Sequence, residues 1–92
     1  AYVNCSAAVK ALCDIICTSG NAREVVESIP ENQPILFVPD KHLGGWLNET
    51  LGREMILWNG ACEVHELFSI ETLNEMKAQH PDAKVMSHPE CP

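Results

Sequence analysis

The sequence predicts an α/β fold, a three-layer α/β/α sandwich built around a short parallel sheet. Short apolar runs alternate along the chain with helical patterns, at the intervals typical of repeated βαβ units. The runs at 35–38 and 55–58 are continuously apolar, which is typical of strands buried on both faces of a parallel sheet. Right-handed crossovers between such strands place helices on both faces. A chain of 92 residues suffices for one such unit, so we expect residues 1–92 to form a single domain.

Local signals begin or end several of the expected elements. Ser6 and Ser69 precede helical patterns and can cap their first turns. Pro30 ends the second helical pattern because proline cannot continue a helix, and Gly52 follows the third, where a left-handed cap is common. In chain order we expect strands at 2–4, 15–17, 35–38, 55–58 and 84–86, alternating with helices at about 7–14, 22–28, 41–51 and 70–80.

The charge of the chain argues against nucleic acid as a partner. The formal net charge is −7, from 13 acidic and 6 basic side chains, and the basic residues form no cluster. Nucleic-acid-binding surfaces are basic, so this balance does not favour DNA or RNA. No apolar run approaches the ~20 residues that a membrane-spanning helix needs. We therefore expect a soluble domain whose partners include neither nucleic acid nor membrane.

The cysteines indicate a reducing compartment, and hence a cytoplasmic protein. Their number, five, is odd, and three of them lie in or beside helical patterns, which does not suit a disulfide-bonded secreted scaffold. We expect the first three to be buried as small hydrophobic side chains. The five are Cys5, Cys13, Cys17, Cys62 and Cys91.

Polar and metal-ligating residues follow the expected strands, at the sheet edge where α/β folds bind ligands. Cys62 and His65 have the spacing of a metal-binding pair, although a lone pair of this kind also occurs by chance. His88 and Glu90 lie two residues apart, so in an extended backbone they face the same way and suit acid/base chemistry. A solvated terminus with ordinary polar residues explains them equally well.

Two further groups point to the same edge. Residues 18–21 combine hydroxyl groups with the start of a helix, where an anion can bind, but a simple capping turn is also consistent with them. Tyr2 and Asn4 can bring a phenol and an amide to this edge, or be buried strand residues. A small, non-catalytic zinc-binding α/β module is therefore one interpretation of the chain. Its ligands would be Cys62, His65, His88 and Cys91.

Taken together, these motifs resemble the quinolinate synthase family, and specifically the middle one of its three related domains. The matching stretches follow the family's order and cover nearly the whole chain, which makes the resemblance far more specific than any one motif. They are residues 2–4, 6–11, 17–22, 37–44, 60–65 and 88–91.

The resemblance implies an enzyme of NAD biosynthesis. In this family iminoaspartate and dihydroxyacetone phosphate condense to quinolinate, and the open iron of a [4Fe-4S] cluster acts as a Lewis acid. Each of three domains donates one cysteine to the cluster, and Cys62 matches this position. The implied partners are the other two domains, both substrates, and an oxidase or dehydrogenase that produces iminoaspartate. Because two cluster cysteines lie outside these 92 residues, we expect the chain alone to be inactive.

The resemblance also implies roles for residues at the expected sheet edge. His88 and Glu90 match the acid/base pair, and Glu90 is the residue expected to move protons during isomerisation and dehydration. His65 matches a position that lines the same cavity. The positions that hold substrate carboxylate or phosphate oxygens match Tyr2, Asn4 and Ser19.

Overall fold

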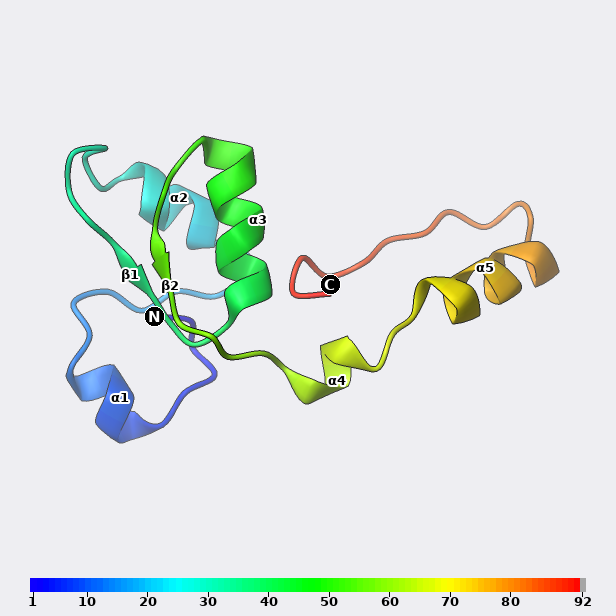
Figure 1. Ribbon diagram of the computed structural model, residues 1–92, viewed down its shortest axis with the longest axis horizontal. Coiled ribbons are helices and arrows are strands. Elements are labelled where there is room, and N and C mark those ends of the chain that lie inside the picture. The colour runs from blue at the N-terminus through cyan, green and yellow to red at the C-terminus, as the bar shows by residue number, and fades with distance from the viewer. Residues whose placement is uncertain (92) are drawn as a thin grey trace.

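The computed structural model describes residues 1–91, which form a packed body and an extended arm (Figure 1). The body is residues 1–62 and the arm is residues 63–87, after which residues 88–91 return to the body. The molecule measures 46 × 28 × 19 Å and has a radius of gyration of 15.3 Å. A compact chain of this length would have a radius of gyration of about 12 Å. The excess reflects the arm, which runs outward before the chain turns back.

The body is an α/β unit with a short parallel sheet, which confirms the predicted fold class. Strands β1 (Leu36–Phe37) and β2 (Ile56–Leu57) are parallel neighbours. Both lie within the continuously apolar runs that predict them. Two isolated parallel bridges join Tyr2 with Cys17 and Asp40 with Gly60. The strands expected at 2–4 and 15–17 are therefore present only as the first of these bridges.

The helices of the body lie where the sequence places them. They are α1 (Ala7–Ala11), α2 (Ala22–Glu27) and α3 (Lys41–Leu51). Ser6 caps α1 by accepting a hydrogen bond from the third N–H of that helix (3.3 Å). Helix α3 is followed by Gly52, whose φ of 63° lies in the left-handed region that glycine adopts at little cost.

The core lies between the sheet and two helices, α2 and α3 (Figure 1). Helix α3 approaches closely at Gly44, where a Cβ atom would be 2.6 Å from Leu57 Cδ2 and 3.0 Å from the Phe37 ring. On the other face of the sheet Leu36 and Ile56 are 61% and 62% exposed, so within residues 1–91 the helices cover one face. The buried hydrophobic core consists of Cys17, Ala22, Val26, Phe37, Leu43, Leu47 and Met55.

The arm contains α4 (Glu63–Glu66) and α5 (Ile70–Gln79), and neither helix has a buried residue. Ser69 caps α5 as expected, accepting a hydrogen bond from the third N–H of the helix (3.2 Å). The prediction of a strand at 84–86 is wrong, because these residues are irregular and exposed. A strand is not stable alone, and within residues 1–91 no other strand pairs with this segment. No helix within residues 1–91 combines the length and the apolar character that crossing a bilayer requires.

Candidate functional site

The body contributes Tyr2 and Ser19 to the candidate site. The backbone N–H of Tyr2 donates to the carbonyl of Val38 (2.8 Å), which ties the start of the chain beside the end of β1. Burial, and then the negative charge of Glu90, raise the pKa of the Tyr2 phenol above its ordinary 10.0, whereas a hydrogen bond with the Ser19 side chain acts in the opposite direction. The phenol is therefore a neutral hydrogen-bond donor at physiological pH.

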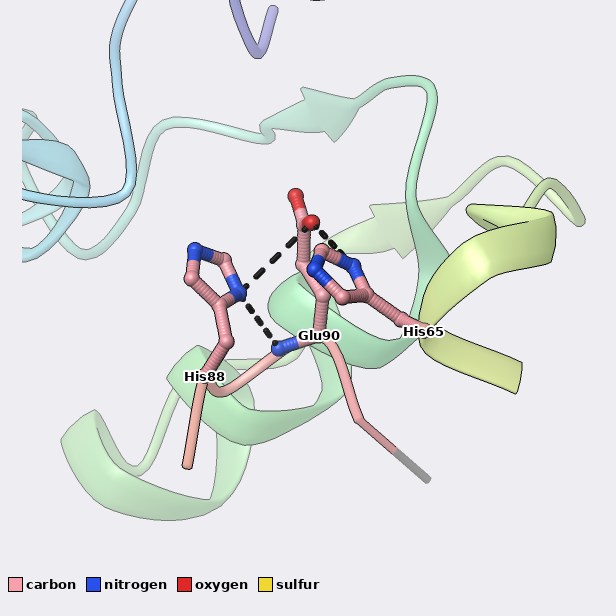
Figure 2. A group of neighbouring side chains, drawn as sticks. All are labelled: His65, His88 and Glu90. Atoms are coloured by element: carbon pink, nitrogen blue, oxygen red, sulfur yellow. Dashed lines mark hydrogen bonds and ion pairs between the residues drawn. The ribbon is translucent and has the colours of Figure 1, made fainter. Parts of the chain in front are cut away.

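A buried carboxylate lies between two imidazoles, where the arm leaves the body and the chain returns (Figure 2). His65 lies on α4, whereas His88 and Glu90 belong to the returning segment. Glu90 Oε2 is 2.7 Å from His65 Nδ1 and 3.6 Å from His88 Nδ1. The two rings stack with centroids 4.7 Å apart and planes 11° from parallel. Glu90 is 2% exposed, and its Oε2 faces both imidazoles.

A turn at Pro89 places His88 and Glu90 side by side. The N–H of Cys91 donates to the carbonyl of His88 (3.0 Å), and the N–H of Glu90 donates to His88 Nδ1 (3.2 Å). The prediction of an extended backbone for these residues is therefore wrong, because the chain turns here. The prediction that the two side chains lie close together is correct. Because His88 Nδ1 accepts a hydrogen bond, the neutral ring carries its proton on Nε2.

Two buried polar atoms of this group have no hydrogen bond within residues 1–91. One is His65 Nδ1, whose short contact with Glu90 is not aligned as a hydrogen bond, and the other is Glu90 Oε1. Buried polar atoms in proteins are almost always paired. The two atoms therefore have open hydrogen-bonding positions that a ligand, a water molecule or another segment can fill.

Within residues 1–91, one group of side chains is close enough together to hold a metal ion. It consists of His65, His88 and Glu90, whose ligating atoms all lie within 4.8 Å of one another. Two imidazoles and a carboxylate suit zinc or a similar divalent ion. No cysteine belongs to the group, so the zinc ligand set that includes Cys62 and Cys91 is not assembled.

Cys62 lies in the loop after β2, beside the parallel bridge that extends the sheet. Its thiol is free, partly exposed, and without a hydrogen bond within residues 1–91. The thiols of Cys5 and Cys13, by contrast, donate to backbone carbonyls at 3.2 Å. Cys17 is buried as expected, and burial raises the pKa of its thiol, whereas the expected burial of Cys5 and Cys13 is wrong, because both are partly exposed. An unpaired, accessible thiol suits a metal ligand, but an iron-sulfur cluster needs several.

Apart from Ser19, two predicted binding elements have no hydrogen bond with His65, His88 or Glu90 within residues 1–91. Asn4 is exposed. In the turn at 18–21, Asn21 Oδ1 accepts hydrogen bonds from the N–H and the hydroxyl of Thr18 (2.7 and 3.1 Å). These bonds are internal to the turn, and the Asn21 side chain makes no capping hydrogen bond to α2.

Sequence reasoning missed two links between α3 and the segment around Cys62. Asp40 suggests a turn or a helix cap, but its carboxylate also bonds the backbone of Cys62, which lies 22 residues away. The second link is from His42, which is partly buried and whose Nε2 lies 3.0 Å from Glu66 Oε1. The sequence around Asp40 indicates a cap, because capping is local. Nothing in the local sequence indicates the contacts of Asp40 with Cys62 or of His42 with Glu66.

Known proteins resemble the chain along its whole length. The family described as Quinolinate synthetase A protein matches residues 1–92. Over 90 residues, the identity is 59% to the quinolinate synthase of Chloroherpeton thalassium, 56% to that of Prochlorococcus marinus strain MIT 9313 and 53% to that of a Synechococcus strain. Each match covers 98% of this chain, which spans only 27% to 28% of the length of these relatives. The chain therefore belongs to the quinolinate synthase family.

Proposed function

We propose that this chain provides part of the active site of a quinolinate synthase, which condenses iminoaspartate with dihydroxyacetone phosphate to quinolinate for NAD biosynthesis. The observation that carries the proposal is the buried Glu90 carboxylate between two imidazoles. Membership of the family supports it. Because the chain spans 28% of its Chloroherpeton relative, the proposed activity is that of a longer polypeptide, and residues 1–92 alone would be inactive.

Glu90 and His88 are the proposed acid/base pair. Isomerisation and dehydration both require a group that removes a proton and a group that returns one. Glu90 Oε1 is buried and unpaired within residues 1–91, so it is available to accept a proton from a substrate. The neutral His88 ring carries its proton on Nε2, because Nδ1 accepts the Glu90 N–H, and Nε2 can donate to a substrate oxygen. The pair thus offers an acceptor and a donor in one place.

Tyr2, Asn4, Ser19 and His65 are the proposed ligands of the substrate's carboxylate and phosphate oxygens. The raised pKa of Tyr2 keeps its phenol protonated, so it can donate a hydrogen bond to an anionic oxygen. Ser19 adds a hydroxyl beside the phenol. His65 Nδ1 is buried and lacks an aligned hydrogen bond within residues 1–91, so a substrate oxygen is a suitable partner for it.

Cys62 is the proposed ligand of a [4Fe-4S] cluster. Its free thiol fits this role, and the further cysteines would come from the rest of the polypeptide, because no ligand group within residues 1–91 contains a cysteine. The bound cluster would supply a Lewis acid at its open iron. Further proposed partners are the remaining two domains and an oxidase or dehydrogenase that makes iminoaspartate, in the cytoplasm.

The test replaces the Glu90 carboxylate in the complete enzyme with an amide of the same size. Glu90→Gln should lower the rate of quinolinate formation by about 10²- to 10⁴-fold, the usual contribution of a general acid or base. Iron and sulfide content should stay unchanged. Glu54→Gln is the matched control, because Glu54 is exposed and lies outside the site. If Glu90→Gln kept most of its turnover with an intact cluster, Glu90 would not carry the proton transfers.

A zinc-binding module is the second candidate, because His65, His88 and Glu90 form a compact ligand group. Metal analysis of the complete protein separates the two functions. Iron and sulfide that disappear in Cys62→Ser support the synthase. One zinc per chain that survives Cys62→Ser and disappears in His65→Ala supports the module.

A further inference from the structure

The carboxylate of Asp40 joins the start of α3 to Cys62. Asp40 is 4% exposed, and both of its oxygens accept hydrogen bonds from backbone N–H groups. Oδ1 accepts from His42 and from Leu43, each at 2.8 Å, and so caps α3. Oδ2 accepts from Cys62 at 3.2 Å. One buried side chain thus serves the helix through one oxygen and the Cys62 backbone through the other.

Other contacts hold the chain on both sides of Cys62. The N–H of Lys41 donates to the carbonyl of Gly60 (2.7 Å), and a Cβ atom at Gly60 would lie 2.4 Å from the carbonyl oxygen of Pro39. Further along, His42 Nε2 contacts Glu66 Oε1 at 3.0 Å. The first turn of α3 therefore contacts Gly60 and Glu66, on either side of Cys62, and Asp40 binds the backbone of Cys62 itself.

We propose that Asp40 is a positioning residue for Cys62: its Oδ2 fixes the backbone from which the thiolate is presented to the cluster. This inference rests on the proposed role of Cys62 as a ligand. A capping role alone requires one oxygen, and serine or asparagine would satisfy it. Only a carboxylate offers a second acceptor on the same side chain, directed at a backbone N–H 22 residues away.

The variant that separates capping from positioning is Asp40→Ser in the complete protein. A serine hydroxyl can cap α3, but it offers no second oxygen to the N–H of Cys62. The control is Ser69→Ala, which removes the cap of α5 in the arm and leaves Cys62 untouched. Cys62→Ser, measured in parallel, tests whether Cys62 is a ligand at all.

The first measurement is amide hydrogen exchange at Cys62 in the folded apoprotein. We expect the wild-type amide to be protected and Asp40→Ser to accelerate its exchange by about tenfold or more, because the hydrogen bond that protects it is lost. Ser69→Ala should leave this rate unchanged. If the wild-type amide exchanged as fast as an exposed one, the proposal would be overturned without any variant, which also covers the case in which Asp40→Ser fails to fold.

The second measurement is made on protein that carries the cluster. Asp40→Ser should lose iron and sulfide faster in air than wild type, and its reduction potential should become more positive, because a buried negative charge near a cluster ligand disfavours the reduced state. Normal retention and potential in Asp40→Ser, with iron lost in Cys62→Ser, would overturn the role of Asp40 and leave the proposed function standing. Full iron content in Cys62→Ser would overturn the ligand role itself, while the exchange rate would still report whether Asp40 holds the Cys62 backbone.

Discussion

The body and the arm have similar apolar side chains but bury them very differently. Leu47, in α3 of the body, is completely buried, whereas Leu67, between the two helices of the arm, is 81% exposed. The difference lies in the packing: α3 packs against α2 and the sheet, whereas α5 has no buried residue. The exposed large hydrophobic residues of the arm are Val64, Leu67, Phe68, Ile70, Leu73, Met76, Val85 and Met86.

The candidate site lies where these two regions meet. Tyr2 and Ser19 come from the body, His65 from the first turns of the arm, and Glu90 from the segment that returns. The site therefore depends on contacts that hold the two ends of the arm against the body. Variants in the body and in the arm can therefore test the packing of each region, and the titration of Tyr2 can test whether the returning segment docks on the body.

The largest expected difference is between Leu47→Ala and Leu67→Ala. Removing the buried Leu47 side chain should lower the free energy of unfolding of the 92-residue chain by about 2–5 kcal/mol, through lost burial and a cavity in the core. Leu67→Ala should change it by less than about 0.5 kcal/mol, because the side chain is exposed. Urea titration followed by tryptophan fluorescence measures both.

Equal losses for the two leucine variants would contradict the comparison, because they would mean that the arm is packed on the body in solution. The same two variants should also be measured in the complete polypeptide. A larger loss for Leu67→Ala there than in the 92-residue chain would show that other segments cover the arm.

Two adjacent glycines of α3 give the next largest difference. Gly44→Ala should destabilise the chain by about 1–3 kcal/mol, since its Cβ would meet Leu57 and Phe37 in the packed interface. Gly45→Ala should stabilise it by about 0.5–1 kcal/mol, because a Cβ there has no atom within 4 Å and alanine favours the helix. The same urea titration measures both, and destabilisation by the two variants alike would mean that a Cβ atom at position 45 also meets a packed neighbour in solution.

The parts of the fold that the sequence predicts are those with local causes. Helices α3 and α5 follow from their apolar spacing together with Gly52 and Ser69, which act within one turn of the chain. The strand expected at 84–86 has a suitable composition, but a strand needs a neighbour, and local sequence does not say whether one is present. Helix α4 is too short to leave a periodic pattern.

In the candidate site, too, the sequence predicts contacts between neighbouring residues but not those between distant ones. His88 and Glu90 are close in sequence, so their association is predictable even though a turn brings it about. The contact of Glu90 with His65 joins residues far apart along the chain, and the sequence suggests only that both lie at the same sheet edge, not that they touch. The bond from Asp40 to Cys62 has no sequence signal beyond a helix cap, because its second acceptor becomes evident only in three dimensions.

The smallest expected effect is a change in the titration of Tyr2, and it tests the docking of the returning segment on the body. Tyr2 is the one tyrosine in the sequence, so the near-ultraviolet absorbance of tyrosinate reports it alone. Its pKa should lie above 10.0, mainly because of burial and next because of the Glu90 charge. Glu90→Gln should therefore lower the pKa only in part, since burial remains, whereas Glu54→Gln should leave it unchanged.

The raised pKa of Tyr2 also fixes the sign of its effect on stability. Because the folded state holds the phenolic proton more tightly than the unfolded state, this contribution is complete below pH 10.0 and is lost as the pH rises through the folded pKa. Glu90→Gln should weaken that loss, because it brings the folded pKa closer to the unfolded one. If the Tyr2 titration were the same in Glu90→Gln and wild type, the returning segment would not rest against the body in solution, and the two regions would not share a site.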